Sequence, residues 1–342
     1  AEAVWITHAG GVGKIMAQWL ESGDPGIDTH EMDVARFHPH NMDEKYIDIR
    51  ASQHYVEVYD IVHPLQQMEE PRNIKLSPFH KSQKELKASF VESAGWERPN
   101  WFDSNKVLLE KFDISRFLRS GWENKEWSPI AIVEHLQTRS NGGLFDLTSF
   151  TKIEVKGKGS LDFLNYVASN DLDKPVGKVI YTSLLTESGG IKCDLTITRL
   201  EEERFLVVTG GGMGLHDLNW VRSKLPVGSD IEINDVSDSM TAIGVWGPKS
   251  RDLLQKISCV DLSSSAFPYM SSKTISISGI ECLALRISYV GELGWEIYGP
   301  ITKGQMLWDS IYGQSGEFGI VPVGLAAFES LRVEKGYRLW GS

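Results

Sequence analysis

The segment Ser288–Tyr298, with the sequence SYVGELGWEIY, places two acidic residues in an apolar and aromatic stretch. Glu292 and Glu296 are four residues apart, and Glu296 is two residues from Tyr298. If 295–298 is a strand, Glu296 and Tyr298 share a face, because side chains alternate along a strand. Burying a carboxylate costs free energy unless hydrogen-bond donors surround it. A ligand with two adjacent N–H groups would supply such donors. A hairpin with a solvent-facing Glu296 is the alternative interpretation.

A second acidic residue, Asp194, follows the glycine pair at 189–190 and opens the run Asp-Leu-Thr-Ile-Thr. Asp is disfavoured inside strands. In a strand, Asp194 would share a face with Thr196 and Thr198. A carboxylate beside hydroxyls at the mouth of a strand suits proton transfer or electrostatic activation at a nitrogen nucleophile. The pattern is equally compatible with an Asp that closes the turn by bonding to its own backbone.

A third candidate is a glycine-rich segment near the start of the sequence. The pattern predicts a strand from Val4, a glycine turn over 7–13 and a helix over 14–20. The glycines of the turn are Gly10, Gly11 and Gly13. Backbone N–H groups at such a helix start attract electronegative ligand atoms. A phosphate-binding loop is a poor match, because Ile15 stands where that motif needs Ser or Thr. A tight turn without a ligand explains the segment equally well.

The gross composition excludes several classes of protein. The 342 residues are enough for two or three domains, and 41% apolar with 24% charged residues is ordinary for a globular protein. The net charge of −11 argues against a nucleic-acid surface, and no apolar run is long enough to span a bilayer. The three cysteines form no Cys-x-x-Cys pair and the nine histidines show no metal spacing. We therefore expect a reducing compartment, without disulfides or a structural metal.

From about Asn141 the hydrophobic pattern alternates pairs of strands with single helices, which indicates α+β layers. Strands are expected at 151–156, 178–185, 191–199, 204–209, 242–246, 274–278, 282–289 and 295–298. Helices are expected at 161–168, 216–224, 303–312 and 325–334, and another begins at Pro248. Upstream, four Trp residues between 96 and 127 predict an irregular connector pinned onto a neighbouring domain.

Together these segments resemble the folate-binding aminomethyltransferase domain of the glycine-cleavage T-protein. The matching runs are LFDLTSFTKIEV, SNDL, YTSLLTESGGIKCDLTITRL, GVWGPKSRDLL, ISYVGELGWEIY and FESLRVEKGYRLWG. Upstream, RNIKLSPF, VESAGWERPNWF and EWSPI are similar to central and connecting regions of the dimethylglycine and sarcosine dehydrogenase group. WITHAGGVGK is similar to the last strand-turn-helix of the FAD domain in that group.

The resemblance implies an α+β fold: a T-protein-like folate-binding domain preceded by the C-terminal remnant of an FAD-dependent amine oxidoreductase and its central domain. The implied parts are the end of the FAD-binding domain at 1–35, the oxidoreductase central domain at 36–100, a connector at 101–140 and the folate-binding domain at 141–342. In that group the flavin half oxidises an N-methyl amine to an iminium. Tetrahydrofolate then takes up the one-carbon unit.

The resemblance also implies site residues. Asp194 corresponds to an acid near the reactive folate nitrogens. The expected folate contacts are Tyr181, Thr196, Tyr289, Glu296 and Arg332. A pterin offers an N–H and an amino group side by side, and the Glu296 carboxylate can accept from both. Partial FAD contacts are expected from Gly10, Gly11 and Gly13, with FAD itself held only by a longer parent protein.

This sequence departs from the family pattern at several places, so other functions remain alternatives to the enzyme. The T-protein often has two acids where Cys193 and Asp194 stand, which weakens a two-carboxylate mechanism. The phosphate-binding start of the FAD domain and the final barrel-like domain are absent, so we expect a fragment that oxidises nothing alone. A regulator similar to the pyruvate dehydrogenase phosphatase regulatory subunit would share this architecture. A folate-binding tRNA-modification or repair factor would fit the later half of the sequence but not the SPF and GWERP segments. The retained Asp194, Tyr289 and Glu296 favour the enzyme.

The partners expected on this basis are a small amine substrate and folate, with no nucleic acid, membrane or metal. A homo-oligomer is compatible with the same assignment. The expected location is the cytoplasm, or the mitochondrial matrix in a eukaryote.

Overall fold

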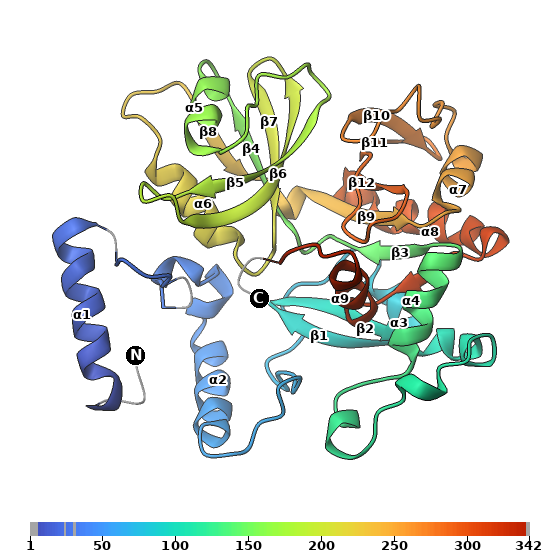
Figure 1. Ribbon diagram of the computed structural model, residues 1–342, viewed down its shortest axis with the longest axis horizontal. Helices are drawn as coiled ribbons and strands as arrows, with labels where there is room; N and C mark the ends of the chain where they lie inside the picture. Colours follow the sequence, from blue (N-terminus) through green and yellow to red (C-terminus); the bar gives the residue numbers. More distant parts are fainter. Residues whose placement is uncertain (1–5, 24, 30–31, 340–342) are drawn as a thin grey trace.

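The computed structural model describes residues 6–23, 25–29 and 32–339, and within them the strands form three sheets (Figure 1). The sheet orders are β1-β2, β5-β6-β7-β4-β8 and β10-β11-β12-β9-β3-β13. The strands are β1 Ala88–Ser93, β2 Trp96–Phe102, β3 Gly143–Asp146, β4 Thr151–Lys156, β5 Val179–Leu185, β6 Ile191–Glu201, β7 Arg204–Thr209, β8 Glu232–Asp235, β9 Met240–Trp246, β10 Ser272–Ile277, β11 Ile280–Leu285, β12 Gly294–Pro300 and β13 Val321–Val323. The α-helices are α1 Ile6–Ser22, α2 Glu44–Glu57, α3 His80–Glu85, α4 Ile130–Ser140, α5 Ser160–Val167, α6 Gly214–Ser223, α7 Ser250–Ile257, α8 Gly304–Ser315 and α9 Leu325–Glu334.

The five-stranded sheet is antiparallel throughout, and one of its faces packs against helices α5 and α6. Its strand β6 shows why: Cys193, Leu195 and Ile197 are buried in an apolar cluster, whereas Asp194 and Thr196 on the opposite face are partly exposed. Helices α5 and α6 contribute Phe163, Leu164, Leu218 and Val221 to the same cluster. The alternation of side chains along β6 therefore directs the polar residues away from the core.

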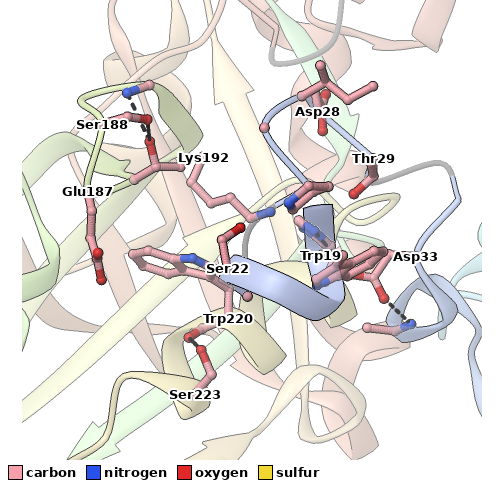
Figure 2. A pocket seen from close by; sticks show the side chains of 18 of the residues that line it. Trp19, Ser22, Asp28, Thr29, Asp33, Glu187, Ser188, Lys192, Trp220 and Ser223 are labelled. Carbon is pink, nitrogen blue, oxygen red and sulfur yellow. Dashed lines mark hydrogen bonds and ion pairs between the residues drawn. The ribbon is translucent and has the colours of Figure 1, made fainter. Parts of the chain in front are cut away.

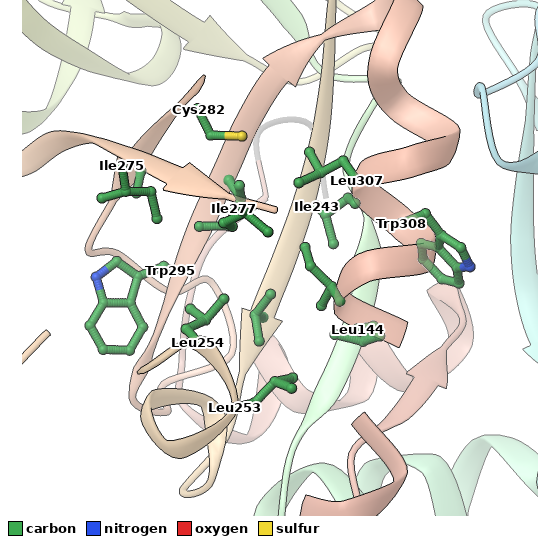
Figure 3. Packing of buried hydrophobic residues seen from close by; sticks show 14 of the residues in the cluster. Leu144, Ile243, Leu253, Leu254, Ile275, Ile277, Cys282, Trp295, Leu307 and Trp308 are labelled. Atoms are coloured by element: carbon green, nitrogen blue, oxygen red, sulfur yellow. The ribbon is translucent and has the colours of Figure 1, made fainter. Parts of the chain in front are cut away.

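The central strands of the six-stranded sheet are buried on both faces. On β12, Trp295 and Ile297 enter a cluster with Leu253 and Leu254 of α7 and Leu307 and Trp308 of α8 (Figure 3). Tyr298, on the other face of the same strand, enters a second cluster that includes Phe328 and Leu331 of α9. This second burial explains why the segment reads as a continuous apolar run instead of an alternating one.

The second cluster also joins the two large sheets. It contains Val179, Leu206 and Val208 from the five-stranded sheet, together with Phe145 and Trp246 from the six-stranded sheet. The two sheets therefore lie side by side, with α9 packed against their junction (Figure 1). Any site built from both sheets must form around this junction.

One buried acid fixes the start of α9. Glu134 of α4 is fully buried and accepts hydrogen bonds from the backbone N–H groups of Phe102 and Gly324, at 2.8 and 2.9 Å. The Asn105 amide donates to the same carboxylate at 2.8 Å and also to the Pro322 carbonyl oxygen. These bonds tie the end of β2 and the connection from β13 to α9 to one carboxylate, so α9 has a defined position.

The predicted α+β class is confirmed, and the predicted helix at 325–334 matches α9. Five of the described strands were not predicted. Three of them, β3, β8 and β13, have only three or four residues and carry too little periodicity. The other two, β1 and β2, form a hairpin, and β2 contains Trp96 and Trp101, where an irregular connector was expected. The predicted strand at 282–289 ends at Leu285, since the Arg286 N–H bonds outside the ladder to the Ser271 carbonyl oxygen. Within the described ranges, no helix combines the length and apolar character that crossing a bilayer requires.

The predicted glycine turn near the start is wrong. Residues Ile6–Ser22 form one continuous helix of 17 residues, in which the three glycines of the expected turn lie in the interior. The apolar residues Val12, Ile15, Met16, Trp19 and Leu20 recur at three- and four-residue spacing, which is typical of a helix. Each interior glycine costs the helix about 1 kcal/mol relative to alanine. Val4, where the strand was expected to begin, lies outside the described residues.

Candidate functional site

The first part of the candidate site is a tyrosine–aspartate pair on adjacent strands. The Tyr181 hydroxyl of β5 donates a 2.6 Å hydrogen bond to Oδ2 of Asp194 on β6. The register places Tyr181 directly opposite Thr196, so all three side chains share the face that points away from the core. Tyr181 is 50% exposed, which leaves the pair open to a ligand. Burial and the hydrogen bond to Asp194 raise the pKa of Tyr181, so its proton stays in place at physiological pH.

The neighbouring Cys193 lies on the opposite face of β6. Its side chain is 1% exposed within the core, and burial raises the pKa of its thiol, as does the nearby Asp217 carboxylate. Asp217 in turn accepts a 2.6 Å hydrogen bond from Thr209. A second acid at position 193 would therefore point into the core and away from Tyr181. The departure at Cys193 does not remove a partner from the Asp194 site.

The second part of the site comes from the loop after β11 and from α9. The Tyr289 ring lies 5.5 Å from Phe328 and 6.0 Å from Tyr337, between centroids, and its hydroxyl donates to the Arg338 carbonyl oxygen. Arg332 is buried; it pairs with Glu329 at 2.7 Å and donates to the Tyr337 carbonyl oxygen at 3.0 Å. The chain after α9 is therefore folded back against the loop that carries Tyr289.

Electrostatic effects connect these two parts. Burial raises the pKa of Tyr289 to about 12, the positive charge of Arg332 opposes this shift, and the Asp194 carboxylate adds to it. Tyr289 in turn contributes to the raised pKa of Tyr181. The structure therefore brings Tyr181, Asp194, Tyr289 and Arg332 within electrostatic reach of one another, with Thr196 beside them on the same sheet face.

Glu296 forms the third part and is held differently. It is 5% exposed and accepts a 2.6 Å hydrogen bond from the Tyr298 hydroxyl on the same face of β12. Opposite it on β9 stands Gly244, where an added Cβ would lie 3.1 Å from Leu147 and Trp246. Burial raises the pKa of Glu296 to about 7, and the Tyr298 bond only partly offsets this shift. Glu296 is thus a desolvated acid with few donors.

Tyr298 is the site residue that sequence reasoning did not assign. Its spacing of two residues from Glu296 placed both on one face, which was the available signal. Glu292, the other acid of the segment, has a structural role instead. Its carboxylate accepts from Arg139 at 2.9 Å, and the same guanidinium also donates to the Leu331 carbonyl oxygen. This network ties the loop before β12 to α4 and α9.

The glycines expected to contact FAD do not form a phosphate-binding turn. Gly10, Gly11 and Gly13 lie inside α1, where backbone N–H groups bond to carbonyl oxygens four residues earlier. Their amides are therefore not free to hold an anion. The described residues do not fit the FAD pyrophosphate at this position.

A cavity of about 760 Å³ lies between the end of α1, the tip of the β5–β6 hairpin and α6 (Figure 2). Trp19 and Trp220 line it together with Lys192. The lining does not include Asp194, Tyr289 or Glu296. Because Lys192 and Asp194 are two residues apart on β6, the cavity lies alongside the strand that carries the Tyr181–Asp194 pair.

Comparisons with known proteins agree with this architecture. Residues 79–342 match the GCVT N-terminal domain, and residues 22–77 match the FAD dependent oxidoreductase central domain. The chain is 34% identical to mitochondrial dimethylglycine dehydrogenase of Mus musculus, over 98% of this chain and 38% of that protein. It is 34% identical to 4-methylaminobutanoate oxidase (formaldehyde-forming) of Paenarthrobacter nicotinovorans, over 98% and 40%. The mitochondrial pyruvate dehydrogenase phosphatase regulatory subunit of Mus musculus is 29% identical over 98% and 38%.

Among solved structures, the aminomethyltransferase T of the glycine cleavage system from Bartonella henselae superposes with a TM-score of 0.63. It is 26% identical, over 78% of this chain and 64% of that one. The chain thus spans about two fifths of the length of the dehydrogenase and oxidase that it matches. With more than three quarters of its residues in one family match, the chain belongs to the GCVT N-terminal domain family.

Proposed function

We propose that this chain carries the tetrahydrofolate-binding, one-carbon-accepting module of an FAD- and tetrahydrofolate-dependent N-methyl amine oxidoreductase. The observation that carries the proposal is the Glu296 carboxylate, which is buried and receives a described hydrogen bond from Tyr298 alone. A carboxylate has about four acceptor positions, so most remain for a ligand. The ring N–H and amino group of a pterin would fill two of them.

Asp194 is the proposed catalytic acid of the module. When bound, tetrahydrofolate supplies the nitrogen nucleophiles that take up the one-carbon unit. The Tyr181 hydroxyl holds Oδ2 of Asp194, so the orientation of the carboxylate is fixed while its other oxygen can accept a proton or stabilise positive charge. Tyr289 and Arg332 are proposed to contact the ligand from the α9 side, and Thr196 from the side of β6.

The flavin chemistry is proposed for the whole protein only. The match of residues 22–77 to an FAD dependent oxidoreductase central domain supports it, whereas the described glycines of α1 do not supply a flavin site. The names of the relatives support an N-methylated amino acid as the substrate class. We also propose the division into parts at 1–35, 36–100, 101–140 and 141–342, and a cytoplasmic or mitochondrial matrix location.

The regulatory subunit among the relatives supports a second, non-catalytic function. A regulator needs neither a buried carboxylate that lacks hydrogen-bond donors nor an exposed tyrosine–aspartate pair. The presence of Glu296 and Asp194 together therefore favours the enzyme. Absence of tetrahydrofolate binding by the intact protein would favour the regulator.

The test is calorimetric titration of the intact protein with tetrahydrofolate at pH 8, where Glu296 is ionised. We expect Glu296→Gln to raise Kd roughly ten- to a hundredfold, the usual effect of losing hydrogen bonds to a charged acceptor. Glu281→Gln, at an exposed acid on the neighbouring strand β11, is the matched control and should leave Kd unchanged. Equal affinities of wild type and Glu296→Gln would overturn the pterin assignment.

A further inference from the structure

Two arginines converge on one serine in the loop that joins α7 to β10 (Figure 1). Arg251 lies in the first turn of α7, and Arg286 directly follows β11. Nη2 of Arg251 and Nη2 of Arg286 donate to Oγ of Ser264, at 3.0 and 3.2 Å. A neutral hydroxyl thus receives two charged donors at an exposed position.

This cluster carries more positive than negative charge. Within the ranges that the structure describes, neither Arg251 nor Arg286 forms an ion pair. Lys273 of β10 adds a third cation, and its charge and that of Arg251 help to lower the pKa of Asp261, after the hydrogen bonds from Ser263. Burial and the charge of Arg251 lower the pKa of Arg286. The two guanidinium groups therefore repel each other without a carboxylate between them.

The Trp295 ring holds the two guanidinium groups in place. Their central carbons lie 6.0 Å (Arg251) and 5.7 Å (Arg286) from the ring of Trp295, a fully buried residue that packs near α7 (Figure 3). Arg286 also donates to the Phe267 carbonyl oxygen. Stacking on an aromatic ring leaves the edges of a guanidinium free to bind an oxyanion. The two donors are thus oriented before any anion arrives.

We propose that Arg251 and Arg286 form a binding site for a phosphoryl group at Ser264. Two sources share this chemistry: a phosphoryl group covalently carried by Ser264, and a free phosphate. The covalent source is favoured by the geometry, because both donors already point at the Ser264 oxygen and the side chain is exposed to a modifying enzyme. Phosphoserine carries close to two negative charges at neutral pH and would neutralise both arginines.

The modification step needs a nucleoside triphosphate and a protein kinase. The bond between the γ-phosphorus and its bridging oxygen breaks, and a bond from that phosphorus to Oγ of Ser264 forms. The hydroxyl proton passes to a base of the kinase, and the nucleoside diphosphate leaves. No group is oxidised or reduced, and the product is a dianion within reach of two guanidinium groups.

The experiment compares two forms of the protein. One has phosphoserine in place of Ser264, and the other has phosphoserine in place of Ser265. Ser265 is also exposed, and its hydroxyl faces Ser263 instead of an arginine. By ³¹P NMR, phosphoserine 264 should titrate about one pH unit lower than phosphoserine 265, because nearby cations favour the dianion. Its Tm should be higher by about 2–4 °C. Arg251→Gln should remove most of both differences.

Lys249→Gln is the matched control, since Lys249 lies near Arg251 in the chain but pairs with Asp252. It should leave the phosphoserine 264 titration unchanged. The second arm measures Tm of the unmodified protein in sodium phosphate and in sodium chloride at equal ionic strength. A rise in phosphate that Arg251→Gln removes identifies a free phosphate as a source. Equal titrations at 264 and 265 without a phosphate effect, or an undiminished shift in Arg251→Gln, overturn the proposal.

Discussion

The Tyr298 hydroxyl donates a 2.6 Å hydrogen bond to the Glu296 carboxylate, and the two residues share one face of β12. Both are buried, and the residue opposite Glu296 on β9 is Gly244, which offers no polar side chain. The acid is therefore removed from water with little compensation. Burial accordingly raises its pKa from the ordinary value of 4.5 to about 7.

This raised pKa makes stability depend on pH. For an acid whose pKa is higher in the folded state, the stabilising contribution is complete below pH 4.5 and is lost as pH rises through 7. Glu296→Gln stays neutral and can still accept from Tyr298. We expect it to be more stable than wild type at pH 8.5, by up to about 3 kcal/mol, with the difference vanishing toward pH 4.5. Urea unfolding at the two pH values measures this, and a pH-independent difference contradicts it.

Asp194→Asn tests the proposed function, because it should separate the two chemistries proposed for the intact protein. Amine oxidation is expected to continue at the wild-type rate, because Asp194 belongs to the proposed folate site and not to the proposed flavin chemistry. Transfer of the one-carbon unit to tetrahydrofolate should fall roughly 10²–10⁴-fold, with formaldehyde released instead. Cys193→Ala, on the opposite face of β6, is the control and should keep the two reactions coupled. Flavin reduction slowed as much as transfer would refute the assignment.

Gly13→Ala tests the conformation of α1. In a helix interior the change should stabilise the helix by up to about 1 kcal/mol, since nothing lies within 4 Å of an added Cβ. Amide hydrogen exchange in α1 should become slower. Gly23→Ala is the contrasting control, because φ of Gly23 is +74° and alanine is strained there. Faster exchange in Gly13→Ala would favour a glycine turn over the helix.

Glu134→Ala should be strongly destabilising. It leaves the buried N–H groups of Phe102 and Gly324 and the amide of Asn105 without their acceptor. Each unsatisfied group costs about 1–3 kcal/mol, so a loss of about 3 kcal/mol or more is expected in denaturant unfolding. Glu110→Ala, at an exposed position in the same region, should change stability by less than about 0.5 kcal/mol. Similar losses in the two variants would show that the Glu134 bonds contribute little.

Local periodicity determined much of the candidate site from the sequence alone. The alternation along 191–199 placed Asp194 and Thr196 on one face and Cys193 on the other, and the same rule placed Glu296 with Tyr298. The bounds of α9 also followed from its helical spacing. These features depend on residues within one turn or one strand of each other, so local geometry specifies them. The family resemblance extended the assignment to Tyr289 and Arg332.

The tertiary structure decided which distant groups meet. Glu134 bonds to Gly324, 190 positions away, and Tyr289 bonds to Arg338, 49 positions away; no local pattern encodes either partner. The parallel pairing of β13 with β3 likewise joins strands far apart in sequence. At α1, the chain forms a helix through the glycines that had suggested a turn. The pKa of Glu296 follows from burial between two sheets and α9, which is a property of packing and not of spacing.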